Sequence, residues 1–417
     1  MKVMIKRKNV IGYLLSFLLI ILSFVLPVNR EILLAFNFAV MIATLFKTRL
    51  SIISLCSIVT NYVVINVYAY DISGIAYGIL GLTKISFVPM LRYMLIWNLS
   101  LLFWGYATRF TEKEKEMLSY DKFNPGKNFS ILCSAIAILS ILIAFPSIPF
   151  VFVANNRFNG LLPGNAWNHL SIVALLFMLP NITKYKFVLV TYGFVFFWFL
   201  SHYERVDVLG VIVVLGFIYL AKNHNKKNEL KKIVKIAVVG LAAFVMLSFL
   251  GESRMGSSLT FSNIFKKLVT QNTASDVGYM YDLAIRYVNE HSLLNGITYI
   301  RYFLKFIPGV DLSYLESTNI LAQYYAVPGG SFILNEPLMN FGLMGVVIIP
   351  NLLISMIYMV LRKKSNLRYM IYIFLLATPF RYLWYGIEYI ETGIVIFIPI
   401  IYILYKITKK GKKYDIC

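Results

Sequence analysis

Charged residues are scarce in this chain, and acidic ones are the scarcest. Charged residues make up 14% of the 417 positions, with 19 Asp and Glu against 40 Lys and Arg, while hydrophobic residues make up 59%. A water-soluble protein of this length cannot bury so many apolar side chains, so much of the chain must face lipid or other helices. The composition therefore predicts an integral membrane protein.

Cysteine and histidine are also rare. The chain has three cysteines; Cys56 and Cys133 lie inside apolar runs and Cys417 is the last residue, so no disulfide framework is expected. The four histidines are scattered, and neither HExxH nor CxxC occurs, which argues against a zinc site.

Several catalytic signatures are missing. The sequence has no GxxxxGK[ST] loop for ATP hydrolysis and no GxSxG elbow for a serine hydrolase. It also has no Asp-x-Asp pair, the usual means of holding a divalent cation against a sugar diphosphate. We therefore expect no metal and no cofactor. The scarcity of acids in mid-span positions counts against an ion-coupled transporter.

Long apolar runs recur along the sequence, and each is long enough to cross a bilayer core of roughly 30 Å. Because backbone polar groups in lipid must be satisfied within their own segment, we expect an all-α polytopic protein with about twelve transmembrane helices. The expected spans are residues 10–26, 31–46, 50–70, 88–107, 129–148, 165–181, 186–201, 205–221, 233–250, 332–361, 369–385 and 389–406. The Gly-broken stretch 72–88 fits either an interfacial segment or a poor span.

The basic residues predict the orientation. Alternate loops are rich in lysine, from Lys2 near the N-terminus to Lys413 in the tail, and such loops lie on the cytoplasmic side. Both termini are then cytoplasmic, and the first apolar run is an uncleaved helix. The net charge of +21 is thereby explained without nucleic acid as a partner. The chain divides into a bundle of nine spans (1–250), a large extracytoplasmic loop with amphipathic helices at the outer membrane surface (251–331), and three spans with a basic cytoplasmic tail (332–417).

The predicted outer face is poor in lysine and richer in arginine. The planar fork of arginine binds phosphate oxygens in pairs and keeps its charge when partly buried, so we expect a phosphate-bearing ligand on that face. The alternatives for each arginine are pairing with a local acid or interfacial snorkelling. The residues expected to bind the ligand are Arg157, Arg205, Arg254, Arg301 and Arg381.

The end of the large loop carries the most specific pattern. Gly329-Gly330-Ser331 is followed by Glu336 and then by Asn340-Phe341-Gly342-Leu343-Met344-Gly345. This segment, together with the layout of spans and outer arginines, resembles the Wzy-type oligosaccharide repeat-unit polymerases, which make O-antigen and capsular polysaccharide. The related O-antigen ligases have a histidine-asparagine pair where this chain has Thr318-Asn319, which argues against a ligase.

The resemblance implies a GT-C-like glycosyltransferase architecture in the bacterial cytoplasmic membrane. It implies metal-independent polymerisation of undecaprenyl-diphosphate-linked oligosaccharides, with the bilayer, a chain-length regulator and a flippase as further partners. A lipid-linked oligosaccharide flippase and an O-antigen ligase-type transferase are the alternatives.

Glycosyl transfer of this kind needs cations for the leaving diphosphate and a base for the acceptor hydroxyl. Glu336 is the first candidate base, followed by His202, Asp282 and His291; the alternative for Glu336 is pairing with a helix dipole. Pro328-Gly329-Gly330 is expected to form a turn, and Gly342 and Gly345 are expected to allow close packing between helices.

Overall fold

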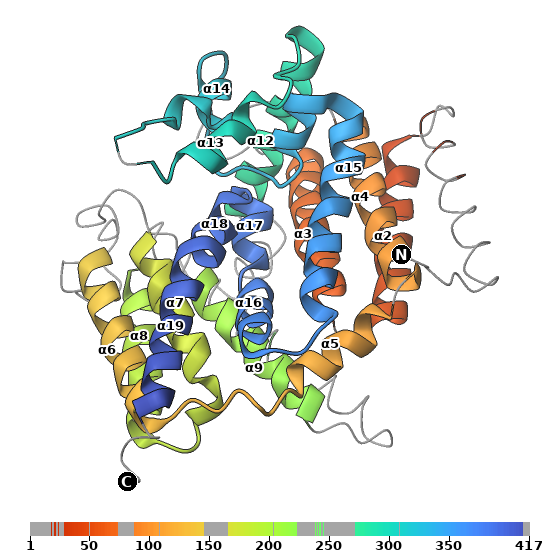
Figure 1. Ribbon diagram of the computed structural model, residues 1–417. Coiled ribbons are helices and arrows are strands. Elements are labelled where there is room, and N and C mark those ends of the chain that lie inside the picture. The colour runs from red at the N-terminus through yellow and green to blue at the C-terminus, as the bar shows by residue number, and fades with distance from the viewer. Residues whose placement is uncertain are drawn as a thin grey trace. The chain divides into compact units, whose positions relative to one another are not determined.

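The computed structural model describes residues 29–49, 51–73, 87–107, 109–145, 166–202, 204–222, 272–307 and 309–411, with a few isolated positions between 18 and 24 and between 238 and 245. Every regular element in these residues is helical, which confirms the expected all-α class (Figure 1). The expected spans 10–26 and 233–250, and most of the stretch 72–88, lie outside the described residues.

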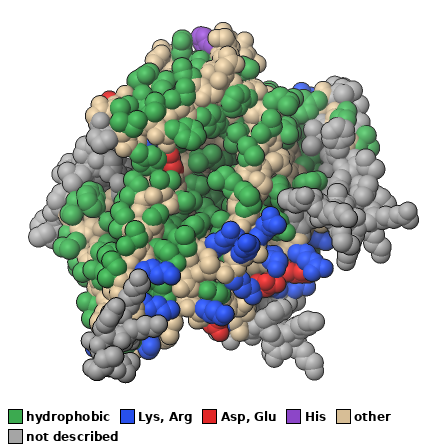
Figure 2. Space-filling model, in the orientation of Figure 1, with side chains coloured by type: hydrophobic (Ala, Val, Ile, Leu, Met, Phe, Trp, Pro, Cys, Tyr) green, Lys and Arg blue, Asp and Glu red, His purple; other side chains and the backbone are tan. Residues whose placement is uncertain are grey.

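Six of the described helices are long and apolar enough to cross a membrane, and two shorter helices, Lys186–Ser201 and Asn366–Ala377, are also apolar. Many of their large side chains are exposed, such as Phe46 (83%), Val190 (69%) and Met344 (62%). Figure 2 shows hydrophobic side chains over much of the visible face, with Lys and Arg gathered together instead of scattered among them. Exposed apolar surface on such helices is typical of contact with lipid, so the chain is a membrane protein. The long helices are Arg30–Thr48, Ile52–Ala69, Phe87–Tyr106, Lys127–Ala144, Asn335–Leu361 and Glu388–Lys409.

The chain forms two compact units, each assembled from separate stretches of sequence. Unit 1 comprises residues 1–114, 269–359 and 379–388, and unit 2 comprises residues 115–268, 360–378 and 389–417. The elements of unit 1 are α2 (Arg30–Thr48), α3 (Ile52–Ser73), α4 (Phe87–Ala107), the start of α5 (Phe110–Leu118), α12 (Asn272–Glu290), α13 (Ile297–Leu304), η3 (Ser313–Leu315), α14 (Ser317–Ala322), α15 (Asn335–Leu361) and α17 (Pro379–Tyr385). The elements of unit 2 are α6 (Lys127–Ala144), α7 (Ala166–Met178), η1 (Leu179–Asn181), α8 (Lys186–Ser201), α9 (Val206–Lys222), α16 (Asn366–Ala377), most of α18 (Glu388–Thr392), the π-helical turn η4 (Gly393–Phe397) and α19 (Ile398–Gly411).

Helices α2, α3 and α4 of unit 1 are joined by a buried group of side chains that we name the amide cluster: Asn37, Ser57, Asn61 and Asn98. Asn98 donates to the Oδ1 atoms of Asn37 (2.9 Å) and Asn61 (3.2 Å), and its own Oδ1 accepts from Asn61 (2.9 Å) and Ser57 (3.2 Å). The Nδ2 of Asn37 also donates to two backbone carbonyls. In lipid the hydrophobic effect does not drive helices to associate, and hydrogen bonds between helices contribute instead. This cluster therefore fixes how the three helices pack.

Helix α15 is broken near its start. Gly342 has φ 58° and ψ −141°, which separates a short segment, Asn335–Phe341, from the long apolar part that follows. A Cβ at Gly345 would lie 2.0 Å from the carbonyl oxygen of Pro337, so the chain after the break passes against the segment before it. Gly345 therefore allows the expected close packing, here between two segments of α15. Gly342 instead allows the break itself, because its positive φ favours glycine.

The predicted span 369–385 is likewise divided. It consists of α16, which ends at Ala377, and α17, which begins at Pro379. Proline lacks an N–H and disfavours helical backbone in the residue before it, here Thr378, which explains the division.

Helix α12, which spans Asn272–Glu290, lies in the loop 251–331 that was expected to contain amphipathic helices. It packs beside α3, where a Cβ on Gly278 would meet the side chain of Val67 at 2.1 Å (Figure 1). Residues on several sides of α12 are buried, among them Ala274, Tyr281 and Asp282. The helix is thus packed more extensively than a single apolar face predicts.

Unit 2 places α6 against α7 and α8, and α16 against α9. Gly210 of α9 permits the second contact, because a Cβ there would lie 1.9 Å from the carbonyl oxygen of Ala377. An edge-to-face aromatic contact ties α19 to the start of α6, with the ring centres of Phe129 and Tyr405 5.3 Å apart. These contacts bring the segment before α6, the turn after η1 and the end of α19 together.

Candidate functional site

The short helix α13 carries basic side chains into a group of acids in unit 1. Arg301 and Lys305 lie four residues apart and so share one face of the helix. The Nη1 atom of Arg301 lies 3.0 Å from Glu388 and 3.6 Å from Glu316, and its Nε lies 3.9 Å from Glu336. Arg301 is only 8% exposed. We name this group, with Tyr302, the carboxylate cluster: Arg301, Tyr302, Lys305, Glu316, Glu336 and Glu388.

Glu336 is the deepest acid of the carboxylate cluster, with 7% of its surface exposed. Its Oε2 accepts a 2.6 Å hydrogen bond from the hydroxyl of Tyr302, which in turn accepts one from Arg301 Nη2 at 3.0 Å. Its Oε1 is buried and has no hydrogen-bond partner among the described residues, and the same holds for Arg301 Nε. Unsatisfied buried polar atoms are rare in folded proteins, and here an acceptor and a donor face each other across 3.9 Å.

The acids of the carboxylate cluster outnumber its bases. If all groups are ionised, three carboxylates face two cations and the net charge is negative. Burial, followed by the negative charge of Glu388, raises the pKa of Glu316 although Arg301 opposes the shift. Burial and the charge of Glu336 raise the pKa of Tyr302, so its hydroxyl keeps its proton. The raised pKa of Glu316 favours its protonated form, which would remove the excess negative charge of the cluster.

The motif residues around Glu336 hold the site in place. The Nδ2 of Asn340 donates to Thr298 Oγ1 at 2.7 Å and to the carbonyl of Glu336 at 2.8 Å, while its Oδ1 accepts from the N–H of Gly296 at 2.9 Å. Asn340 thereby fastens the start of α13 to the first segment of α15. This fixes Arg301 opposite Glu336.

The Gly-Gly-Ser segment forms the predicted turn, with φ 107° at Gly329 and 82° at Gly330. A Cβ at Gly330 would lie 3.1 Å from Val277 and 3.3 Å from the carbonyl of Trp384, so only glycine fits without displacement. The N–H of Ser331 then donates to that same carbonyl at 2.9 Å. The turn, which lies a few residues before Glu336 in the sequence, is thus held against α17 by a backbone hydrogen bond.

Three other predicted residues lie elsewhere in unit 1. Asp282 is fully buried on α12 and forms an ion pair with Arg286, with 2.7 Å between Oδ2 and Nε, so its charge is already compensated. Arg381 is 4% exposed on α17, and its guanidinium lies 5.6 Å from the ring centre of Tyr385. The ring of His291 contacts that of Tyr324 in a tilted arrangement, with ring centres 4.2 Å apart.

His202 and Arg205 belong to unit 2. His202 is 1% exposed; its Nδ1 lies 2.8 Å from the carbonyl of Trp198, and its ring centre is 4.5 Å from that of Phe145. Arg205 is partly exposed between α8 and α9. Arg157 and Arg254 lie outside the described residues. Of the predicted residues, the structure therefore brings together Glu336 and Arg301.

Reasoning from the sequence did not single out Tyr302 or Glu316, although both contact residues that it did select. The position of Tyr302 next to Arg301 was the only signal available, because its bond to Glu336 joins residues that are distant in the sequence. Within the described part of the chain, no group of three or more His, Cys, Asp or Glu side chains is arranged to hold a metal ion.

Comparison with protein-family models, with curated proteins and with solved structures gave no match. The apolar helices define the class of this protein as a helical membrane protein. Its distinguishing feature is a buried acid, Glu336, beside the break in the long apolar helix α15. Its activity is a matter for proposal.

Proposed function

We propose that the chain is a membrane glycosyltransferase that polymerises lipid-diphosphate-linked oligosaccharide repeat units on the outer face of the bacterial cytoplasmic membrane, without a metal. The observation that carries the proposal is the position of Glu336 at the break in α15. It is a buried carboxylate whose Oε1 lies 3.9 Å from Arg301 Nε and has no hydrogen-bond partner among the described residues. The resemblance of residues 329–345 to Wzy-type polymerases supports the same reading, and the proposal includes the twelve expected spans and a GT-C-like layout.

In the proposed reaction a hydroxyl oxygen of the acceptor glycan attacks the anomeric carbon of the donor sugar. The bond between that carbon and the diphosphate oxygen breaks, and the lipid diphosphate leaves. Glu336 accepts the hydroxyl proton on its Oε1 atom. Arg301 stabilises the negative charge that develops on the diphosphate.

The exposure of the acids makes this role of Arg301 feasible. Glu316 and Glu388 each have side chains that are 39% exposed, against 9% for Glu336. An incoming diphosphate can therefore displace these two carboxylates from Arg301 into solvent without unpacking the core, while Glu336 stays in place. The excess of acids in the carboxylate cluster means that further cations are needed, and Arg381 of unit 1 is a proposed source. The roles of Arg157, Arg205 and Arg254 in binding the diphosphate stay predictions from the sequence.

The test is Glu336→Gln, which keeps size and hydrogen bonding but is not an effective base. We expect polymer formation in isolated membranes to fall by about 100-fold or more, while the variant still binds lipid-linked substrate. The matched control is Glu290→Gln: Glu290 also accepts a 2.6 Å hydrogen bond from a tyrosine hydroxyl, that of Tyr325, but lies exposed at the end of α12. Normal chain-length ladders from Glu336→Gln would remove Glu336 from the mechanism.

A flippase is the second candidate, because a broken membrane helix beside a buried charge is also typical of transporter sites. The two are separated by the product left in a cell that carries Glu336→Gln. Loss of a polymerase leaves single repeat units on the cell surface, whereas loss of a flippase leaves none there.

A further inference from the structure

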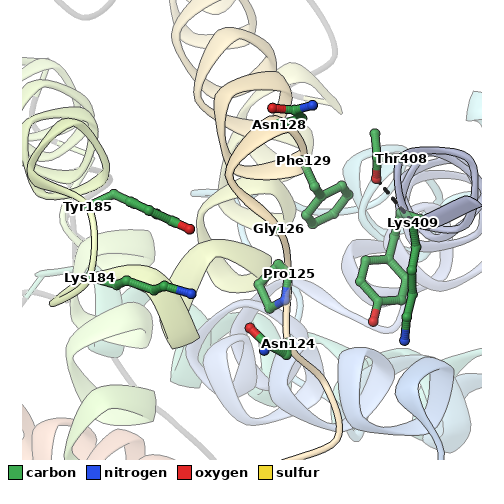
Figure 3. Close-up of a pocket in the computed structure, with 10 residues that line it drawn as sticks. Asn124, Pro125, Gly126, Asn128, Phe129, Lys184, Tyr185, Thr408 and Lys409 are labelled. Atoms are coloured by element: carbon green, nitrogen blue, oxygen red, sulfur yellow. Dashed lines mark hydrogen bonds between the residues drawn. The ribbon is translucent and has the colours of Figure 1, made fainter. Parts of the chain in front are cut away.

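A cavity of about 260 Å³ lies in unit 2, where the segment before α6, the turn between η1 and α8 and the end of α19 meet (Figure 3). Pockets for drug-sized ligands run from about 300 Å³ upward, so this one has room for a small headgroup. Ten residues from these three segments line it: Asn124, Pro125, Gly126, Asn128, Phe129, Lys184, Tyr185, Tyr405, Thr408 and Lys409.

The charge of the lining is positive. Lys184 and Lys409 are both exposed, and no acid is among the lining residues. Figure 3 shows Lys184 and Tyr185 reaching from one side towards Pro125 and Gly126, with Lys409 on the other side. Each lysine ammonium lies over a tyrosine ring, 5.3 Å from that of Tyr185 and 5.8 Å from that of Tyr405. Two cations from different segments therefore flank one small space.

The floor of the cavity is fixed and offers further donors. Asn181 Nδ2 donates to the carbonyl of Pro125 and to Ser130 Oγ, both at 2.7 Å, which holds the turn before α6. Gly126 is the N-cap of α6, and no side chain caps this end of an 18-residue helix. First-turn N–H groups and the positive end of the helix dipole add to the attraction for an anion.

We propose that this cavity binds a phosphate ester group, presented by the headgroup of an anionic phospholipid. The lining supplies what such a group requires: two cations, backbone and amide donors, and aromatic side chains beside them. All three segments are among those whose lysines predict the cytoplasmic side, and basic pockets between helices at that depth bind anionic headgroups. The site is independent of the proposed polymerase activity.

The experiment titrates the purified full-length protein in a zwitterionic detergent with short-chain phosphatidylglycerol, and separately with inorganic phosphate, by calorimetry. Lys184→Gln/Lys409→Gln is compared with Lys186→Gln/Lys406→Gln, a pair on the same segments with the same charge change but outside the lining. We expect saturable binding of phosphatidylglycerol that weakens at least tenfold in the first pair and less than threefold in the second.

The same pattern with inorganic phosphate but not with the lipid would identify a soluble phosphate ester as the ligand of this cavity. Equal weakening in both pairs would show general attraction to a basic surface and overturn the proposal. Full binding in the first pair, with unfolding temperatures equal to that of the unaltered protein, would overturn it as well.

Discussion

Unit 1 contains two buried polar groups that differ in how completely they are satisfied. In the amide cluster, the side-chain atoms of Asn37, Asn61 and Asn98 all have partners, and all of its residues are 0% exposed. In the carboxylate cluster, Glu336 Oε1 and Arg301 Nε have none among the described residues, and two of the acids reach solvent.

This difference indicates that the amide cluster serves the packing of helices, whereas the carboxylate cluster serves binding or catalysis. A closed network of neutral amides has no capacity left for a ligand, so its value lies in specifying the packing of α2, α3 and α4. In the carboxylate cluster, Glu336 Oε1 and Arg301 Nε pair only at 3.9 Å and have no hydrogen-bond partner among the described residues, beside a break in α15. Buried charged groups that lack hydrogen bonds are costly, and they are often found where a function uses them.

The largest effect is expected from Arg301→Gln. Removing this cation leaves Lys305 as the one cation of the cluster against three carboxylates. Breaking a buried ion pair costs about 3–5 kcal/mol. In the double variant Arg301→Gln/Glu336→Gln part of this loss should return, because the most buried carboxylate no longer carries charge. Denaturant unfolding in detergent would measure both. A double variant no more stable than Arg301→Gln would show that the two residues are not coupled.

A smaller effect is expected from Asn98→Leu in the amide cluster. The change removes four hydrogen bonds and leaves the amides of Asn37 and Asn61 partly unpaired. Because a single hydrogen bond between membrane helices contributes about 0.6 kcal/mol, the expected loss of folding stability is about 2 kcal/mol. Polymer formation per folded molecule should not change. If it is abolished at matched amounts of folded protein, the distinction between the two clusters fails.

The smallest effect concerns Asp276 on α12, a partly buried acid whose Oδ1 has no hydrogen-bond partner in the described part of the chain. Burial raises its pKa from the ordinary 3.8 to about 6. The folded protein thus binds this proton more tightly than the unfolded chain, so ionised Asp276 destabilises the fold above pH 6, and the penalty fades as the pH falls towards 4.

Asp276→Asn should therefore stabilise the protein at pH 7.5 and do so less at pH 5. A shift of this size corresponds to at most about 3 kcal/mol, and partial exposure reduces it to about 1 kcal/mol. Thermal unfolding at the two pH values measures the difference. Equal stabilisation at both would show that the carboxyl does not titrate in this range, and a loss of activity with unchanged stability would add Asp276 to the site.

Several helices could be predicted from sequence because long apolar runs leave few choices for backbone in lipid. The predicted span 186–201 matches α8 at both ends, and 31–46 lies within α2. The break in α15 could not be predicted, because Gly342 looks the same in the sequence whether it packs against a neighbour or takes a positive φ.

The site was predicted in its parts and not in its arrangement. Glu336 and Arg301 were both selected, one by motif and one by charge type, but in separate roles as base and as diphosphate ligand. The ion pair between them, and the contacts of Arg301 with Glu316 and Glu388, join residues that are distant in the sequence. Such pairings depend on the tertiary structure, and residue spacing does not encode them.

The break in α15 also bears on the order in which the chain is made. The carbonyls of Met339 and Asn340, which precede the break, accept hydrogen bonds from the N–H groups of Leu294 and Asn295. Those donors leave the ribosome before α15 does, so they can already be present when this helix inserts. A permuted chain that supplied residues 294–295 after α15 would have to insert the break with its carbonyls unpaired in lipid. The sequence order of loop and helix therefore has a biosynthetic consequence that the finished fold does not reveal.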